Sequence, residues 1–136
     1  MPRETTYLSL NGLLLTEAHF RTWFSTHADD GIRYFAAVDA AEIKGVSVLQ
    51  TTKIENAELM VLAIRPVAQG QGIGGSLLDH ALQTVRVQGY RTLLVKVFAD
   101  NRIMQRLLLS RAFQPIRMEH HGRWDGGDMV WWKITL

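Results

Sequence analysis

The chain has 136 residues, of which 47% are hydrophobic and 21% charged, so it is long enough for one hydrophobic core and is not expected to be disordered; we expect a single domain over residues 1–136. The absence of cysteine excludes disulfide bonds and thiolate metal sites. The formal net charge is +2, with five Lys/Arg and eight Asp/Glu in residues 1–64 against ten and five in residues 65–136, so the second half is the basic one.

Targeting signals are also missing from the sequence. The N-terminal MPRETTYLSL lacks the basic, apolar and small-residue succession of a signal peptide, and no apolar run approaches the ~18 residues of a membrane span. We therefore expect a cytoplasmic protein with no membrane partner. No nucleic-acid partner is expected, because the basic half has neither a dense Lys/Arg stripe nor aromatic residues interleaved with such a stripe. A small phosphorylated cosubstrate fits this charge distribution better.

The first half of the sequence predicts one helix and three strands. Thr16 caps a run of aromatic residues at helical spacing, which predicts an amphipathic helix that ends near residues 29–31. Residues 33–39 and 45–54 are typical of two antiparallel strands joined by a turn at residues 41–44. Residues 59–64 (LMVLAI) form an unbroken apolar run, as expected of a central strand buried on both faces.

The second half alternates between helices and strands. An apolar stripe at helical spacing predicts an amphipathic helix, which Gly89 ends; the stripe consists of Ile73, Leu77, Leu78, Ala81, Leu82 and Val85. Residues 92–98 predict the next strand, and residues 101–112 predict another helix. Two final strands are expected around a turn at residues 125–127.

Four glycines in VAQGQGIGGSLL (residues 67–78) stand between the apolar strand and the following helix. Each glycine in a regular element costs roughly 0.5–1 kcal/mol, so the cluster indicates a use, most often close approach of backbone amides to a phosphate. A Walker loop is excluded because Ser76 stands where its Lys belongs. Gly70, Gly72 and Gly75 match the dinucleotide pattern GxGxxG, with Asp100 as a ribose ligand, but too little chain follows Asp100 to complete that kind of domain.

A third pattern, Gln/Arg-x-x-Gly-x-Gly/Ala, is matched by residues 69–74 (QGQGIG). With this motif, the chain resembles the GCN5-related N-acetyltransferase (GNAT) superfamily over residues 33–113. The resemblance implies an α/β acetyltransferase fold, with a mixed, splayed sheet of six to seven strands flanked by helices. It also implies acetyl-CoA as donor, held in the splay with its diphosphate on the amides of residues 71–75, and CoA as product. The implied cosubstrate contacts are Ile64, Gln69, Gly70, Gln71, Gly72, Ile73, Gly74, Gly75 and Asn101. A glycine-rich turn without a ligand is the simpler alternative.

Acetyl transfer to an amine needs a deprotonated nucleophile, because an alkylamine with a pKa near 10.4 is protonated at neutral pH. Glu58 is the candidate base, since it borders the apolar strand and stands eleven residues before Gln69, the spacing of the catalytic Glu in the histone-modifying branch of the family. An ordinary strand-end Glu in solvent is the alternative.

The resemblance assigns two further roles to this strand and leaves one role unfilled. It implies that the backbone amide of Leu62 stabilises the oxyanion, and that the pantetheine arm pairs alongside Ile64 as an added strand. Many family members carry a Tyr as general acid where this chain has Leu108. The route of the proton to the leaving thiolate is therefore open.

The acceptor is expected to be a primary amine, on a small molecule or as the Lys or N-terminal amine of a peptide, which attacks directly in a ternary complex. Acidic residues near the segment that shapes the acceptor site in the family favour a cationic acceptor: Glu17, Asp29 and Asp30. The hairpin at residues 120–128 (HHGRWDGGD) is either an acceptor gate or a plain connection, and Trp131 either lines the acceptor pocket or packs under a helix.

Three further expectations concern metals, activity and assembly. No carboxylate spacing completes a metal site around the five histidines, so none is expected. The alternative to an enzyme is a catalytically idle acetyl-CoA sensor that regulates a protein partner. A monomer or a homodimer is expected.

Overall fold

The computed structural model describes residues 6–9, 14–16, 31–39, 42–51, 55–68 and 70–136. The helix predicted after Thr16 lies outside the described residues, and so do the acidic residues of that segment and Gln69. Thr16 itself is the last residue of a strand, a position from which a residue can still cap a helix, so its role as a cap stays a prediction.

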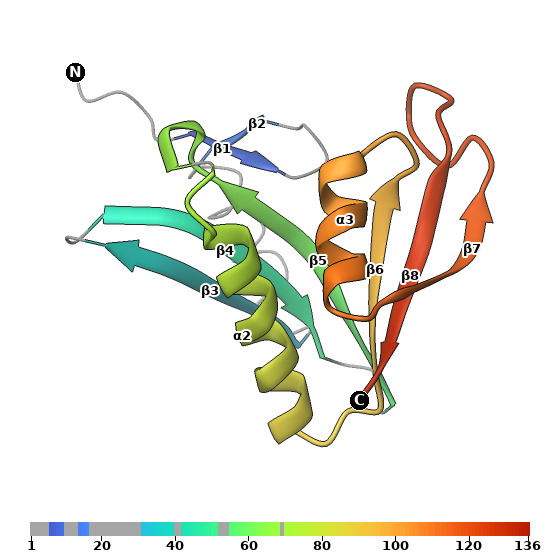
Figure 1. The fold of residues 1–136 in the computed structure, drawn as a ribbon, viewed down its shortest axis with the longest axis horizontal. Helices are drawn as coiled ribbons and strands as arrows, with labels where there is room; N and C mark the ends of the chain where they lie inside the picture. Colours follow the sequence, from blue (N-terminus) through green and yellow to red (C-terminus); the bar gives the residue numbers. More distant parts are fainter. Residues whose placement is uncertain (1–5, 10–13, 17–30, 40–41, 52–54, 69) are drawn as a thin grey trace.

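The described residues form one sheet and two α-helices (Figure 1). The helices are α2 (Ile73–Val87) and α3 (Arg102–Ser110), and a 3-10 turn, η1 (Pro66–Ala68), precedes α2. Neither α2 nor α3 is long and apolar enough to cross a membrane. The strands are β1 (Thr6–Ser9), β2 (Leu14–Thr16), β3 (Ile32–Asp39), β4 (Glu42–Gln50), β5 (Asn56–Ile64), β6 (Thr92–Phe98), β7 (Gln114–Glu119) and β8 (Met129–Thr135).

The sheet is mixed, because β5 and β6 run parallel while the other paired strands are antiparallel. β4 lies between β3 and β5, and β8 lies between β6 and β7. The expected α/β architecture is confirmed. The sheet has eight strands where six to seven were expected, because β1 and β2, with four and three residues, are too short to show a period in the sequence.

Two strands begin earlier than predicted. β4 starts at Glu42 and β5 at Asn56, each three residues before the expected position. β5 was expected to be buried on both faces, but consecutive buried residues occur only at Leu62–Ile64, and Met60 is 49% exposed. The second half of β5 is therefore buried on both faces, as predicted for an apolar run, whereas its first half is buried on one face only.

Helices α2 and α3 lie on the same face of the sheet, which we call the helix face (Figure 1). The helix-face core includes Leu93, Val95 and Val97 of β6. Because successive strand residues point to opposite faces, Leu94, Lys96 and Phe98 lie on the other face, which we call the rear face. The buried residues of the helices join the same core: Leu77, Leu78, Ala81, Leu82 and Val85 of α2, as predicted, and Met104 and Leu108 of α3.

Candidate functional site

Strands β5 and β6 part halfway along their lengths. Their parallel pairing begins at Asn56 and stops at the pair Leu59–Val95. β6 stays paired with β8 to its last residue, and β5 continues with β4 on its other side. Residues 60–62 of β5 and 96–98 of β6 therefore border a gap, because no described strand pairs with either segment on that side. Figure 1 shows the two strands diverging toward the end at which β1 lies.

A β-bulge at Met60 interrupts the pairing of β5 with β4 beside this gap. The pairing between β4 and β5 slips by one residue there, which leaves Met60 without a partner on β4. Beyond the bulge, the Arg65 N–H donates to the Lys44 carbonyl of β4 at 2.8 Å. Since the N–H groups of alternate strand residues point to opposite sides, the amides of Leu62 and Ile64 point away from β4. Leu62 thus faces the gap, whereas Ile64 faces the side on which β1 pairs with β5.

The glycine loop leads from β5 into the start of α2. Gly70 and Gly72 adopt left-handed conformations, with φ of 79° and 77°, which other residue types rarely adopt. Gly72 is the N-cap of α2 and offers no side-chain acceptor, and the first turn carries no acidic residue. The first amides of a helix have no intrahelical acceptor and stand at the positive end of its dipole. The start of α2 is therefore suited to an anion.

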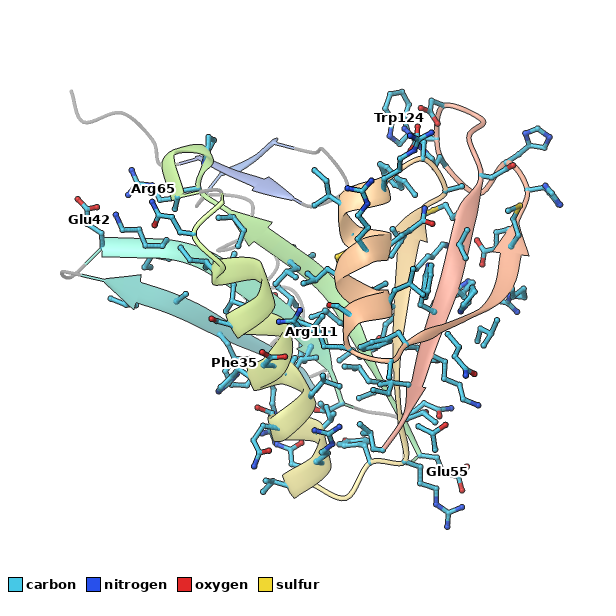
Figure 2. The ribbon with its side chains drawn as sticks, in the orientation of Figure 1. Phe35, Glu42, Glu55, Arg65, Arg111 and Trp124 are labelled. Carbon is cyan, nitrogen blue, oxygen red and sulfur yellow. The ribbon has the colours of Figure 1, made fainter. Side chains whose placement is uncertain are left out.

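Arg111 lies beside this first turn, although the sequence did not mark it as a site residue. Its Nε and Nη2 donate to Asp79 of α2 at 3.0 and 3.3 Å, so it links the end of α3 to α2 (Figure 2). A Cβ at Gly75 would lie 2.6 Å from Arg111 Nη2, so a side chain at this position would require the guanidinium to move. No local pattern reveals this contact, because Asp79 and Gly75 lie on another helix.

Asn101 and Leu108 fix the position of α3. Asn101 caps the helix, since its Oδ1 accepts the Met104 N–H at 3.1 Å, and it closely follows the end of β6 at the wide end of the gap. Leu108 is fully buried in the helix-face core. The position at which a general-acid Tyr was considered therefore holds an apolar core side chain.

Glu58 lies on the rear face, near the closed end of the gap. Its neighbours Ala57 and Leu59 belong to the helix-face core, so its own side chain points the other way. Glu58 is half-buried and stands in register with Leu94 of β6, one residue before the pairing of β5 and β6 stops. The Glu58 carboxylate therefore lies beside the point at which the gap opens.

The hairpin between β7 and β8 is anchored to the end of β6 by Arg123. The Arg123 guanidinium donates to Asp100 at 3.0 Å and to Asp125 at 2.9 Å, and it lies 3.9 Å from the centre of the Phe98 ring. Its side chain is only 16% exposed. The anchor leaves Trp124 at the tip of the hairpin 85% exposed (Figure 2).

Glu119, the last residue of β7, holds two rear-face side chains. Its carboxylate accepts the Trp131 indole N–H at 2.7 Å and forms an ion pair with Lys96 at 2.9 Å. These contacts hold the pKa of Glu119 below its usual range, and the hydrogen bond from the Trp131 indole is the largest cause.

In the described part of the chain, no three His, Asp or Glu side chains come together as a metal site. A pocket of about 230 Å³ lies between β3 and α2, and its lining includes Phe35 and His80, whose rings meet edge to face with their centres 4.7 Å apart. Because β4 and β5 separate β3 from β6, this pocket is distinct from the gap.

Comparison with known proteins gives a family and a fold. Residues 5–113 match the family model described as Acetyltransferase (GNAT) family. The mycothiol acetyltransferase of Rhodococcus jostii (strain RHA1) is 38% identical over 53 residues, which cover 39% of this chain and 17% of that protein. The match therefore spans less than a fifth of that relative.

Two solved structures share the architecture over most of both chains. The ribosomal-protein-S18-alanine N-acetyltransferase from Escherichia coli has a TM-score of 0.73 at 23% identity, with 82% of this chain and 75% of that chain covered. A GNAT family acetyltransferase from Elizabethkingia anophelis with acetyl-CoA bound has a TM-score of 0.72 at 20% identity, with 88% and 83% covered. At these identities, the likeness shows the fold.

Proposed function

The chain belongs to the acetyltransferase (GNAT) family, and from this premise we propose that it is an N-acetyltransferase that moves an acetyl group from acetyl-CoA to a primary amine. The amine belongs to a small molecule, or is the Lys or N-terminal amine of a peptide, and attacks directly while both substrates are bound. The observation that carries the proposal is the gap between β5 and β6, toward which the Leu62 amide points and beside which the glycine loop begins.

The residues at the gap fit acetyl-CoA. The uncapped amides of residues 71–75, after Gln69 and Gly70, would bind the diphosphate, assisted by the dipole of α2. The unpaired edge of β5 at residues 60–62 would pair with the amide-bearing arm, as an added strand does. We assign the contact at Ile64 to the end of this edge beside β1, and that at Asn101 to the opposite wall.

Glu58 and Leu62 divide the chemistry between them in this proposal. Acetyl-CoA supplies the acetyl thioester. Glu58 takes a proton from the amine, directly or through water, so that the C–N bond forms as the C–S bond breaks. The Leu62 N–H stabilises the negative charge that develops on the acetyl oxygen. Leu108 offers no proton, so the thiolate leaves unaided, which its pKa near 8.5 permits, and solvent reprotonates it.

The test is an assay of CoA thiol release from acetyl-CoA in the presence of pooled primary amines and peptides. Release that depends on the amine, with the acetylated product identified by mass spectrometry, supports an N-acetyltransferase. A protein whose melting temperature rises with CoA but which acetylates no member of the pools contradicts the proposal and favours the catalytically idle sensor.

A further inference from the structure

The rear face carries a row of three side chains from three adjacent strands. Trp132 lies in the helix-face core, so Trp131 points to the rear face, where it stands in register with Lys96 of β6 and Arg117 of β7. Lys96 Nζ lies 5.4 Å and Arg117 Cζ 5.7 Å from the centre of the Trp131 ring. Two cations therefore flank one indole, both within the range of cation–π attraction.

Glu119 fixes this row in place. One carboxylate oxygen accepts the Trp131 N–H, and the other contacts Lys96 Nζ at 2.9 Å. Since both oxygens are engaged, neither the indole nor the ammonium group rotates freely. The contacts of Glu119 thus hold Trp131 and Lys96 together within the protein itself.

The β7–β8 hairpin lies along one side of the row. A Cβ at Gly122 would lie 2.9 Å from Glu119 Oε2, so the hairpin backbone packs against that carboxylate. Arg123 lies over Phe98, which is a rear-face residue two positions beyond Lys96. The hairpin therefore lies at the edge of the rear face, directly beside the row.

Cations outnumber carboxylates at this place. Lys133 shares the strand and the face of Trp131, and it stands in register with Leu94 of β6. It is half-buried and forms no ion pair with any residue that the structure describes. Among the described residues, Lys96 and Arg117 share the carboxylate of Glu119, whereas Lys133 has no counter-ion, and a half-buried ammonium in that position favours an anionic ligand.

The excess of cations lies close to the candidate base. Glu58, Leu94 and Lys133 stand side by side on β5, β6 and β8, on the same face. Neighbouring strands are about 4.8 Å apart, so the backbone of Lys96 is roughly one strand from β5 and that of Lys133 roughly two. A molecule whose amine lies at Glu58 would reach both ammonium groups with a group about 5–10 Å away.

We propose that Lys96, Trp131 and Lys133 bind the acceptor, and that the acceptor carries a carboxylate about 5–10 Å from its reacting amine. Short ω-amino acids and peptides with an acidic side chain close to the N-terminus have this spacing. The apolar surfaces of Leu94 and Trp131 would contact the methylene groups between the two ends, and Arg117 would contribute at the exposed rim, where its side chain is 65% exposed. This inference rests on the proposed function and names the substrate class of that site.

The experiment compares two ligands that differ only in charge, 6-aminohexanoate and 6-aminohexanamide. Their binding to the protein saturated with CoA is measured by isothermal titration calorimetry, which requires no turnover. We expect the carboxylate to bind at least about tenfold more tightly than the amide, as a charge-assisted contact predicts. In Lys133→Gln and Lys96→Gln the two ligands should bind nearly alike, whereas Arg86→Gln, on the last turn of α2, should keep the wild-type preference.

Equal binding of the two ligands to the wild type, or no binding of either, overturns the proposal. A preference that survives both lysine substitutions overturns it as well, because the anion would then be held elsewhere. CoA must still raise the melting temperature of each variant, which shows that the variant is folded. Thiol release reports on the proposed function separately, so a protein that acetylates amines but treats the two ligands alike contradicts only the acceptor class.

Discussion

A carboxylate placed at Gly72 should abolish the binding of CoA without unfolding the protein. An ideal Cβ at Gly72 has no heavy atom within 4 Å, so a side chain there meets only its own backbone strain at φ of 77°. Asn and Asp tolerate this conformation better than other residues with a side chain, at a cost of roughly 1–2 kcal/mol. Gly72→Asp and Gly72→Asn therefore form a pair of nearly equal shape and different charge.

The expected magnitude follows from the position of residue 72 at the start of α2. CoA at about 100 times its Kd stabilises the native state by about 2.7 kcal/mol, which for a chain of this size raises Tm by roughly 10 °C. A carboxylate about 5 Å from one diphosphate charge costs about 3 kcal/mol at an effective dielectric constant near 20. That repulsion cancels the binding energy available at this concentration, so the Tm shift of Gly72→Asp should fall to nearly zero, while Gly72→Asn keeps part of it.

The assay is differential scanning calorimetry with and without CoA. Gly89→Asp is the matched control, because Gly89 has φ of 83°, has no heavy atom within 4 Å of its ideal Cβ, and lies at the other end of α2. It should keep the full CoA shift. A folded Gly72→Asp protein with an undiminished shift would refute the assignment of the diphosphate to the start of α2.

Three other substitutions test the remaining parts of the structure. Glu58→Gln should lower turnover by roughly 10² to 10⁴ and remove the acidic limb of the pH profile, with the CoA shift in Tm unchanged; wild-type turnover at every pH would make Glu58 a structural residue. Leu108→Ala removes a side chain with 0% exposure, so urea unfolding should show a loss of about 2–5 kcal/mol, and a loss under about 1 kcal/mol would contradict its place in the core. Glu119→Gln should be less stable than the wild type at neutral pH. Because folding lowers the pKa of Glu119, its contribution is complete above the ordinary carboxyl pKa and is lost as the pH falls through the folded value, so the two unfolding curves should converge in acid; a difference that persists there would contradict the ion pair and indole contacts.

Local periodicity explains which parts of the fold the sequence predicted. The apolar stripe of α2 repeats every three to four residues over Ile73–Val87, and its buried residues are those predicted. In β5 the run LMVLAI conceals the alternation that would reveal the bulge at Met60, since every residue is apolar whichever face it occupies. The divergence of β5 and β6 was expected only from the family resemblance, because it depends on where pairing between two distant segments stops.

The sequence could not predict side-chain clusters built from several strands, because they too depend on how distant segments pair. The sequence left Trp131 between two roles, and the contacts from which we argue its role, its register with Lys96 and Arg117 and its hydrogen bond to Glu119, appear only in the structure. The contact of Arg111 with Asp79 likewise joins two helices that no local pattern connects.

The two halves of the proposed reaction rely on different parts of the chain, and this difference explains why the sequence points to the donor site more fully than to the acceptor site. On the donor side the proposed contacts at residues 71–75 are backbone amides, which leave their trace in the sequence as glycines that clear the approach to the main chain, whereas the Leu62 amide leaves none. On the acceptor side the proposed contacts are side chains of Glu58, Lys96 and Lys133, which the order of β5, β6 and β8 brings side by side. The sequence does not show which side chains lie beside a charged residue on a strand, because that depends on the register between strands. Changing the acceptor therefore requires only a different side chain at one of these strand positions, whereas changing the donor requires a different backbone path.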